Sequence, residues 1–522
     1  MTITLTLDPA FTIGPVRPRT FGAFVEHLGR CVYEGIYEPT HPNADEDGFR
    51  TDVIELTKEL GATSIRYPGG NFVSGYRWED GIGPKEQRPT RLDLAWHSSD
   101  PNHVGIDEYM KWCEKTGVEP MMAVNLGTRG VQEALDLLEY CNVPSGTHFS
   151  DLRRKNGREE PYRIKMWCLG NEMDGPWQIG HKTAEEYARL ATETARAMRM
   201  IDPTIELVVC GSSSSEMDTF GTWEATVLKE AYEYVDMVSA HVYYWEKDGD
   251  LTSFLASAVN MDHFIDSVAA TADYVRAAGK HTKRINISFD EWNVWYMDRA
   301  ESVPPKGDDW PVAPVLLEDH YNVADAVVVG NCLISLLRHT DRVASASLAQ
   351  LVNVIAPIMT ETGGRAYKQT TFHPFAITAA HATGEVLRVG IESPTVNTKR
   401  FGDVQIADAV ATRDPETGEV NLFVVNRSET ESHELRVDLR ALRDGSTGSN
   451  AGASSDGGKA VNFGAALNLK AAVTLHNDDH TWQATADDDT SVAPTTNESA
   501  RIDGSELIIT LPAISWSHIQ LG

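Results

Sequence analysis

The chain has 522 residues, of which 41% are hydrophobic and 23% are charged, and its formal net charge is −30. This length exceeds one ordinary domain, and the composition is typical of a globular protein with a large core. The negative charge argues against nucleic acid and anionic membrane surfaces as partners, because both bind basic patches. A neutral, small-molecule substrate is compatible with it.

The first residues, MTITLTLDPAFTIGP, alternate between apolar and polar side chains as a strand does. They lack the basic start and apolar run of a signal peptide, and the chain has no apolar stretch of about 18 residues. We therefore expect a cytoplasmic protein with no membrane span. The six cysteines are scattered without a CxxC pair, which predicts buried free thiols.

From about residue 18 to 380, short apolar runs alternate with amphipathic, helix-like stretches. The runs are 20–28, 63–70, 119–127, 163–172, 206–213, 236–244, 284–292 and 345–353. Strands that alternate with helices predict a parallel sheet. Eight such units favour an α/β fold of the closed (β/α)8 TIM-barrel type over an open, doubly wound sheet.

After residue 380 the long helical patterns give way to short alternating runs such as EVNLFVVNRS and SELIITLPAISWSHIQL. This pattern predicts a C-terminal all-β sandwich, jelly-roll-like, over 381–522. We expect residues 1–17 to join it as a strand, because they precede the barrel and have no partner there. The region of about 443–500 is rich in Gly, Ser, Ala, Asp and Thr, which predicts flexible loops, above all in DGSTGSNAGASSDGGKA.

The residues that end each run are the candidate functional groups, because chemistry in a β/α barrel takes place at the C-terminal ends of the strands. In chain order they are Glu26 and His27, Arg66 and Asn71, Asn125, Asn171 and Glu172, His241, Tyr243 and Tyr244, Asp290, Glu291 and Asn293, and Gln350 and Asn353. Amides and acids suit sugar hydroxyls, and aromatic rings suit sugar faces. Two glutamates on different strands suit glycoside hydrolysis, in which one is held protonated and the other stays ionised.

The residues at the ends of these runs do not indicate a metal site, a serine-hydrolase site or a nucleotide-binding site. They contain no spaced Cys and His cluster, no GxSxG elbow and no phosphate-binding glycine loop. We therefore expect no metal and no organic cofactor.

Each candidate also has a simpler interpretation. A glutamate at a strand end is more often an ordinary loop acid, His241 could be a satisfied core histidine, and Trp295 could be core packing instead of a platform for a sugar. Glu172 and Glu291 are harder to explain in this way. Each follows an apolar run that we expect to be buried, where a charge without partners costs several kcal/mol.

Long motifs resemble those of glycoside hydrolase family 51, the intracellular α-L-arabinofuranosidases. They are RYPGGNFVSGYRWEDGIGP, WCLGNEMDGPWQIGHK, SAHVYY and FDEWNVWY, with FVEHLGRCVYEGIYEP near the start. The resemblance spans nearly the whole chain. It departs at Glu34, where a small residue, commonly glycine, is expected, and in extra length near 443–500.

The resemblance implies a role for each candidate residue. Glu172 would be the general acid/base, Asn171 would hold the sugar 2-hydroxyl, Glu291 would be the nucleophile, and Tyr243 would hydrogen-bond to that nucleophile. Glu26, Arg66, Asn71 and Gln350 would line the furanose pocket, Trp96 and Trp295 would lie towards the leaving group, and His241 would lie close to the nucleophile.

The implied activity is exo-acting hydrolysis of terminal α-L-arabinofuranosyl residues from arabino- and arabinoxylo-oligosaccharides, with retention of configuration. The family is commonly homo-oligomeric, often hexameric. The alternatives are another furanosidase or an endo-glucanase or xylanase on the same barrel, a non-catalytic carbohydrate-binding protein, and a metal-dependent barrel hydrolase. The preference among α-1,2, α-1,3 and α-1,5 linkages, and the acceptance of doubly substituted xylose, stay open at this stage.

Overall fold

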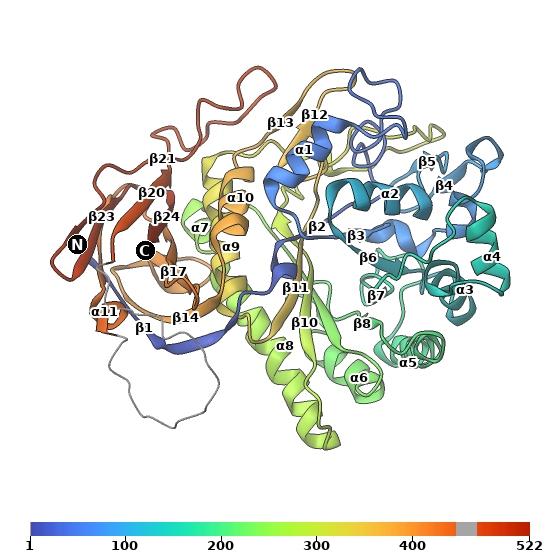
Figure 1. The fold of residues 1–522 in the computed structure, drawn as a ribbon, viewed down its shortest axis with the longest axis horizontal. Coiled ribbons are helices and arrows are strands. Elements are labelled where there is room, and N and C mark those ends of the chain that lie inside the picture. The colour runs from blue at the N-terminus through green and yellow to red at the C-terminus, as the bar shows by residue number, and fades with distance from the viewer. Residues whose placement is uncertain (1, 445–466) are drawn as a thin grey trace.

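The computed structural model describes residues 2–444 and 467–522. Within them, parallel strands close a barrel in the order β10-β11-β2-β3-β6-β7-β8-β9 (Figure 1). The strands are β2 (Gly22–Phe24), β3 (Ser64–Tyr67), β6 (Glu119–Val124), β7 (Met166–Leu169), β8 (Glu206–Val209), β9 (Met237–Tyr244), β10 (Asn286–Val294) and β11 (Val343–Leu348). Each strand overlaps one of the predicted apolar runs, so the closed barrel is confirmed and the open sheet is wrong.

Helices surround the barrel and connect its strands. They are α1 (Thr51–Leu60), α2 (Ile106–Thr116), α3 (Val131–Asn142), α4 (His148–Lys155), α5 (Ala184–Ile201), α6 (Thr222–Ala231), α7 (Leu251–Leu255), α8 (Ala258–Gly279), α9 (Val323–Arg338) and α10 (Phe372–His381). Short 3₁₀ turns are η1 (Pro18–Phe21), η2 (Asn71–Ser74), η3 (Trp78–Gly81), η4 (Lys85–Gln87) and η5 (Ala300–Ser302). None of the described helices is long and apolar enough to cross a membrane.

The second domain is an all-β sheet, as predicted, with the order β21-β20-β24-β18-β17-β14-β1-β19-β23-β22. Its strands are β1 (Thr2–Pro15), β14 (Glu385–Glu392), β17 (Ala407–Arg413), β18 (Val420–Asn426), β19 (His433–Asp438), β20 (Leu469–Leu475), β21 (Thr495–Thr496), β22 (Arg501–Asp503), β23 (Glu506–Leu511) and β24 (Ser515–Leu521), with helix α11 (Arg440–Asp444) after β19. The N-terminal strand β1 pairs antiparallel with β14 and parallel with β19. Both ends of the chain therefore lie in this domain (Figure 1).

Three small hairpins extend from these two domains. They are β4 (Arg91–Asp93) with β5 (Ser98–Asp100), β12 (Ile358–Thr360) with β13 (Ala366–Lys368), and β15 (Thr395–Thr398) with β16 (Gly402–Gln405).

The segment predicted as flexible loops divides into two parts. Residues 445–466, which hold nearly all of the glycine- and serine-rich stretch, lie outside the described residues. The part from 467 onward contains β20 and β21, and the connection between these strands packs on the barrel, because the Val323 N–H donates to the His480 carbonyl at 3.1 Å. All six cysteines are free and buried, as predicted.

Helix α9 lies between the barrel and the β-domain (Figure 1) and carries the polar link between them. Asp408 of β17 accepts hydrogen bonds from Asn331 of α9 at 2.8 Å and from Arg427 at 2.9 Å, and it also pairs with Arg338 at the end of α9. Burial alone would raise the pKa of Asp408, but the charges of Arg338 and Arg427 outweigh it and hold this pKa below its usual value. The buried cluster therefore fixes the β-domain against the barrel.

Candidate active site

A cleft of about 600 Å³ opens where the barrel strands end. Eight of the residues to which the family resemblance assigns a role line it, and they are Glu26, Asn71, Trp96, Glu172, Tyr243, Glu291, Trp295 and Gln350. Tyr244, another candidate at a run end, lines it too. The other three residues with such a role, Arg66, Asn171 and His241, lie behind this surface and bond to Glu291, Asn71 and Glu172, respectively, which form it. The barrel thus brings together all eleven residues to which the resemblance assigns a role.

Glu291 is held from two sides. In β10 the pairing with β9 shifts register between Ser288 and Glu291, an irregularity that re-aims side chains at the ends of barrel strands. Arg66 Nη1 donates to Glu291 Oε1 at 2.8 Å, and the Tyr243 hydroxyl donates to Oε2 at 2.6 Å. Burial alone would raise the pKa of Glu291, but the charges of His241 and Arg66 and these hydrogen bonds outweigh it and lower this pKa below its usual value. Glu291 is therefore ionised at neutral pH.

Glu172 lies on a turn directly after β7. Gly170 and Glu172 both have left-handed backbones, with φ of 90° and 44°, and such strain in a non-glycine residue is typical of functional sites. Trp177 Nε1 donates to Glu172 Oε2 at 2.7 Å, and His241 Nδ1 lies 2.9 Å from Oε1. Burial lowers the pKa of His241, but the carboxylates of Glu291 and Glu172 outweigh it and raise this pKa above its usual value. A protonated imidazole is thus stabilised between the two acids.

The two glutamates are close neighbours in space. One carboxylate oxygen of each, together with a ring nitrogen of His241, lie within 4.8 Å of one another. This grouping among the described residues has the spacing of a metal site, but its oxygens already accept hydrogen bonds from Arg66, Tyr243 and Trp177. The expectation that no metal takes part stays a prediction.

Glu26 lines the cleft just after the end of β2. It accepts hydrogen bonds, each of 2.9 Å, from the Phe72 N–H, from Trp96 Nε1 and from Gln350 Nε2. Burial raises the pKa of Glu26 to about 8, although the Phe72 N–H opposes the shift. A Cβ atom on Gly69, whose φ is 157°, would lie 2.7 Å from Glu26 Cγ, so the RYPGG motif needs glycine here for the close approach of its backbone to Glu26.

Asn171, which follows β7, is linked through Arg66 to Glu291 on the other side of the cleft. Its Oδ1 accepts from Arg66 Nη2 at 2.7 Å, and its Nδ2 lies 3.4 Å from Asn71 Oδ1. Because its oxygen is used by Arg66, the Asn171 amide N–H₂ is the part that can reach a ligand.

Four polar residues at strand ends serve the scaffold instead of the cleft. His27 lies between Asp100 and the Tyr67 hydroxyl, at 2.8 Å from each. Asn293 donates to the carbonyls of Ala349 and Ile355, and Asn353 donates to that of Arg30. The Asn125 side chain donates to the Tyr76 carbonyl and accepts from the Arg129 N–H.

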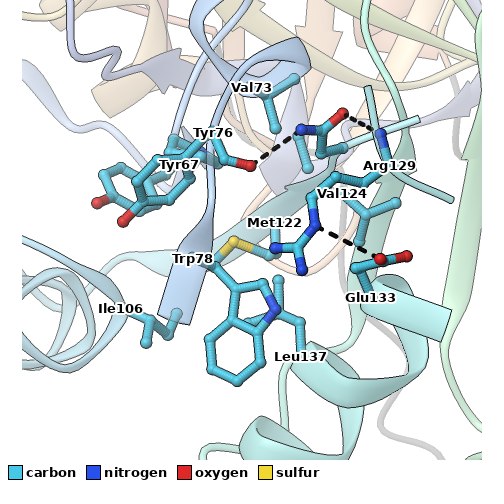
Figure 2. Close-up of a pocket in the computed structure, with 13 residues that line it drawn as sticks. Tyr67, Val73, Tyr76, Trp78, Ile106, Met122, Val124, Arg129, Glu133 and Leu137 are labelled. Carbon is cyan, nitrogen blue, oxygen red and sulfur yellow. Dashed lines mark hydrogen bonds and ion pairs between the residues drawn. The ribbon is translucent and has the colours of Figure 1, made fainter. Parts of the chain in front are cut away.

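Asn125 borders a second, much smaller cavity on the outer side of the barrel wall, which Figure 2 shows. Its volume is about 20 Å³, and apolar side chains such as Met122 and Leu137 line most of it. Arg129 points across it towards Glu133, at 3.6 Å between Nε and Oε1 (Figure 2). This space holds at most a water molecule, not a sugar.

Part of the cleft wall is formed by residues that the sequence patterns do not predict. These residues are Trp177, residues 213–216, Trp245, Lys247, Asn260 and Arg400. The sequence does offer a clue to Trp177, because this residue follows Glu172 closely within the motif WCLGNEMDGPWQIGHK. The sequence offers no clue to Arg400, because this residue belongs to the β-domain and does not follow a barrel strand.

Glu34, where the sequence departs from the family pattern, has a left-handed backbone with φ of 65°. Glycine adopts this conformation without strain, which explains why a small residue is expected here. The Thr362 hydroxyl donates to the Glu34 carboxylate at 2.6 Å.

Comparisons with known proteins match this architecture along the whole chain. The family described as "Alpha-L-arabinofuranosidase 1 domain" matches residues 56–272, and "Alpha-L-arabinofuranosidase C-terminal domain" matches residues 290–515. An intracellular exo-α-(1→5)-L-arabinofuranosidase from Streptomyces lividans is 60% identical over 84% of this chain and 67% of its own length. An exo-α-(1→6)-L-arabinofuranosidase from Bifidobacterium longum is 54% identical over 99% of this chain and 97% of its own.

The fold has close relatives among solved structures. The structure of a family 51 α-L-arabinofuranosidase from Bifidobacterium longum superposes on this one with a TM-score of 0.92. The two chains are 49% identical, and the superposition covers 100% of this chain and 99% of the Bifidobacterium chain.

Proposed function

Since the chain belongs to the α-L-arabinofuranosidases of glycoside hydrolase family 51 and is an exo-acting enzyme of this type, we propose that Glu172 and Glu291 perform its reaction as a retaining double displacement. The observation that carries the proposal is the spacing of the two carboxylates, one oxygen of each lying within 4.8 Å. Retaining enzymes hold their carboxyl groups about 5–5.5 Å apart, whereas inverting enzymes need about 6.5–9.5 Å to admit a water.

In the first step the ionised Glu291 attacks the anomeric carbon, and protonated Glu172 gives its proton to the leaving oxygen. The glycosidic bond breaks and an ester between the sugar and Glu291 forms. Arg66 and Tyr243 keep the Glu291 carboxylate charged and oriented before attack.

In the second step Glu172, now ionised, takes a proton from a water molecule that attacks the anomeric carbon. The ester breaks, Glu291 is restored as a carboxylate, and arabinose leaves with its original configuration. His241 and Trp177 orient Glu172 through both steps, because they donate to its two oxygens.

The sugar-binding roles follow from the donors and acceptors that the cleft presents. Glu26, Asn71 and Gln350 surround the space next to Glu291 and serve the furanose hydroxyls. The Asn171 amide, whose oxygen accepts from Arg66, serves the 2-hydroxyl with its N–H₂ group, while Trp96 and Trp295 supply apolar ring faces.

The substrates are terminal arabinofuranosyl residues on small oligosaccharides. The relatives differ in the linkage that their names give, α-(1→5) in one and α-(1→6) in the other, so linkage preference depends on loops beyond the catalytic pair. The word "intracellular" in the name of the Streptomyces relative supports a cytoplasmic location for this chain.

We also infer a homo-oligomer, which the family resemblance suggests. Exposed apolar side chains support it. They belong to Leu92 and Leu94 near the β4–β5 hairpin and to Val312 and Val315 in the loop after β10, and stacking of His97 on Trp310 joins these two segments. Sedimentation velocity of the full chain tests this inference, and a monomer at micromolar concentration contradicts it.

Azide trapping tests the assignment of the two glutamates on p-nitrophenyl α-L-arabinofuranoside. In Glu291→Ala, azide takes the place of the nucleophile and gives the inverted, β-configured arabinosyl azide. In Glu172→Ala, azide attacks the sugar ester from the opposite face and gives the α-configured azide. The reverse pattern of products, or full activity in either variant, rejects the assignment. Unchanged wild-type activity after dialysis against EDTA is the result expected of a metal-free reaction.

A further inference from the structure

The cleft continues past Glu172 along a wall that the furanose pocket leaves unused. This wall is formed by Trp177, residues 213–216 after β8, Trp245 and Lys247 after β9, Asn260 in α8, and Arg400. The whole cleft, at about 600 Å³, is of the size that holds a drug-sized ligand and exceeds the needs of one furanose ring.

The position of Glu172 sets the direction of the substrate in this cleft, and this step rests on the proposed function. A general acid must lie within hydrogen-bond reach of the leaving oxygen. The furanose lies over Glu291, so the sugar chain that leaves is on the Glu172 side. The wall beyond Glu172 therefore faces the leaving group.

The chemistry of the wall suits a neutral oligosaccharide. The Trp177 side chain is 51% exposed and offers a ring face next to Glu172. Further along, the Tyr244 hydroxyl donates to Asn260 Oδ1 at 3.1 Å and Asn260 Nδ2 lies 3.4 Å from Ser215 Oγ, which fixes an amide and a hydroxyl in the wall. Such fixed polar groups beside aromatic rings give orientation and specificity to a sugar.

Arg400 comes from the other domain. It lies on the turn of the β15–β16 hairpin, where its backbone N–H donates to Ser253 Oγ of α7 at 3.3 Å. Its Nη2 lies 2.9 Å from Glu216 Oε1, so this pair closes the wall between the loop after β8 and the β-domain.

The Arg400–Glu216 pair is not needed to hold the domains together. Both side chains are partly exposed, at 33% and 64%, and ion pairs of this kind contribute about 0–1 kcal/mol. The buried cluster around Asp408 already provides the interdomain link.

We propose that Arg400 and Glu216 form the distal end of a leaving-group subsite that binds the second sugar unit of the departing oligosaccharide. The β-domain then takes part in selecting the length of the substrate. Arg400 donates to hydroxyls of that unit and Glu216 accepts from them, and Trp177 and Asn260 bind the unit before it.

Two oligosaccharides separate this subsite from the rest of the cleft. Exo cleavage of α-1,5-arabinotriose releases a two-unit leaving group, and cleavage of α-1,5-arabinobiose releases one unit. The quantity to measure is the ratio of kcat/KM on the triose to that on the biose, in the wild type, Arg400→Ala and Arg400→Lys. The matched control is Arg436→Ala, which removes an arginine with exposed ion pairs in the same domain.

We expect Arg400→Ala to lower this ratio about tenfold, the effect of losing one hydrogen bond from a charged donor. Arg400→Lys should lower it less, and Arg436→Ala should leave it unchanged. If Arg400→Ala and the wild type have the same ratio, the subsite is overturned. This holds also if Arg400→Ala cleaves both sugars more slowly than the wild type but to the same extent. A wild type that cleaves p-nitrophenyl α-L-arabinofuranoside but neither sugar overturns the subsite alone. A wild type that cleaves none of the three substrates overturns the proposed function as well.

Discussion

Arg66 and Glu291 form a buried ion pair across the mouth of the barrel, with 2.8 Å between Nη1 and Oε1. Their strands β3 and β10 are not neighbours, since β2 and β11 lie between them. The pair therefore exists only because the sheet closes, and it brings positive charge to a carboxylate that would otherwise be neutralised by burial.

Removing the Arg66 charge should impair Glu291, the proposed nucleophile. In Arg66→Gln the pKa of Glu291 rises, because a neighbouring positive charge no longer favours its ionised form. Since attack requires the ionised form, the acid limb of the kcat/KM profile should move to higher pH, and kcat should fall at least about tenfold. Arg19→Gln, which alters an ion pair with Glu119 and Glu206 at the opposite end of the strands, should keep the wild-type profile.

Tyr243→Phe keeps the ring, which packs edge-on against Trp295, but removes the hydroxyl that donates to Glu291. A hydrogen bond to a charged group contributes about 1.5–3 kcal/mol, so we expect kcat to fall roughly tenfold to a hundredfold. Steady-state kinetics on an aryl arabinofuranoside measure this fall. Tyr274→Phe, at a tyrosine that is 68% exposed, serves as the control, and equal rates in both variants would refute the role of Tyr243.

Glu26 should make folding stability depend on pH. Burial raises the pKa of Glu26 to about 8, whereas an ordinary glutamate has a pKa of about 4.3. At a pH between these two values, the unfolded chain releases the Glu26 proton and the folded chain retains it. Ionisation then favours the unfolded state, and the contribution of Glu26 to stability, complete below about pH 4.3, is lost as the pH rises towards 8. Urea unfolding at pH 5 and pH 8 measures the loss, which Glu26→Gln should abolish. A variant that loses as much stability as the wild type contradicts this assignment.

Asp408→Asn should loosen the two domains. It leaves Arg338 and Arg427 without their buried carboxylate, and breaking such a pair costs about 3–5 kcal/mol. Because the folded pKa of Asp408 is lowered, its contribution is complete above the ordinary aspartate value of about 3.9 and is lost as the pH falls below it. Urea unfolding at pH 7 compares this variant with Asp438→Asn, whose aspartate pairs near the surface with Arg440. Equal stability of the two variants counts against the interdomain role.

Glu34 allows a test of backbone strain. Both Glu34→Gly and Glu34→Ala lose the bond from Thr362, but only glycine relieves the left-handed conformation with φ of 65°. We expect the glycine variant to be more stable than the alanine variant by about 1 kcal/mol, measured as the difference in unfolding free energy. A more stable alanine variant would mean that this backbone conformation carries no strain.

The sequence by itself determined the barrel and the region of its site. Apolar runs and helical stretches alternate from residue 18 to 380, and this local periodicity depends on neighbouring residues alone. Parallel strands in a barrel must end at the same mouth, so their order in the chain predicts that residues such as Glu172 and Glu291 meet there.

Only the tertiary structure decided what each strand-end side chain does. Asn125, Asn293 and Asn353 end their runs as Asn171 does, yet they bond to backbone groups of the scaffold, because loop conformations select their partners. Arg400 reaches the cleft because the β-domain is docked on α9, a placement that no local pattern encodes. Periodicity is a property of short segments, whereas hydrogen-bond partners and domain contacts depend on which distant residues the closed barrel and the docked sheet bring within about 3 Å.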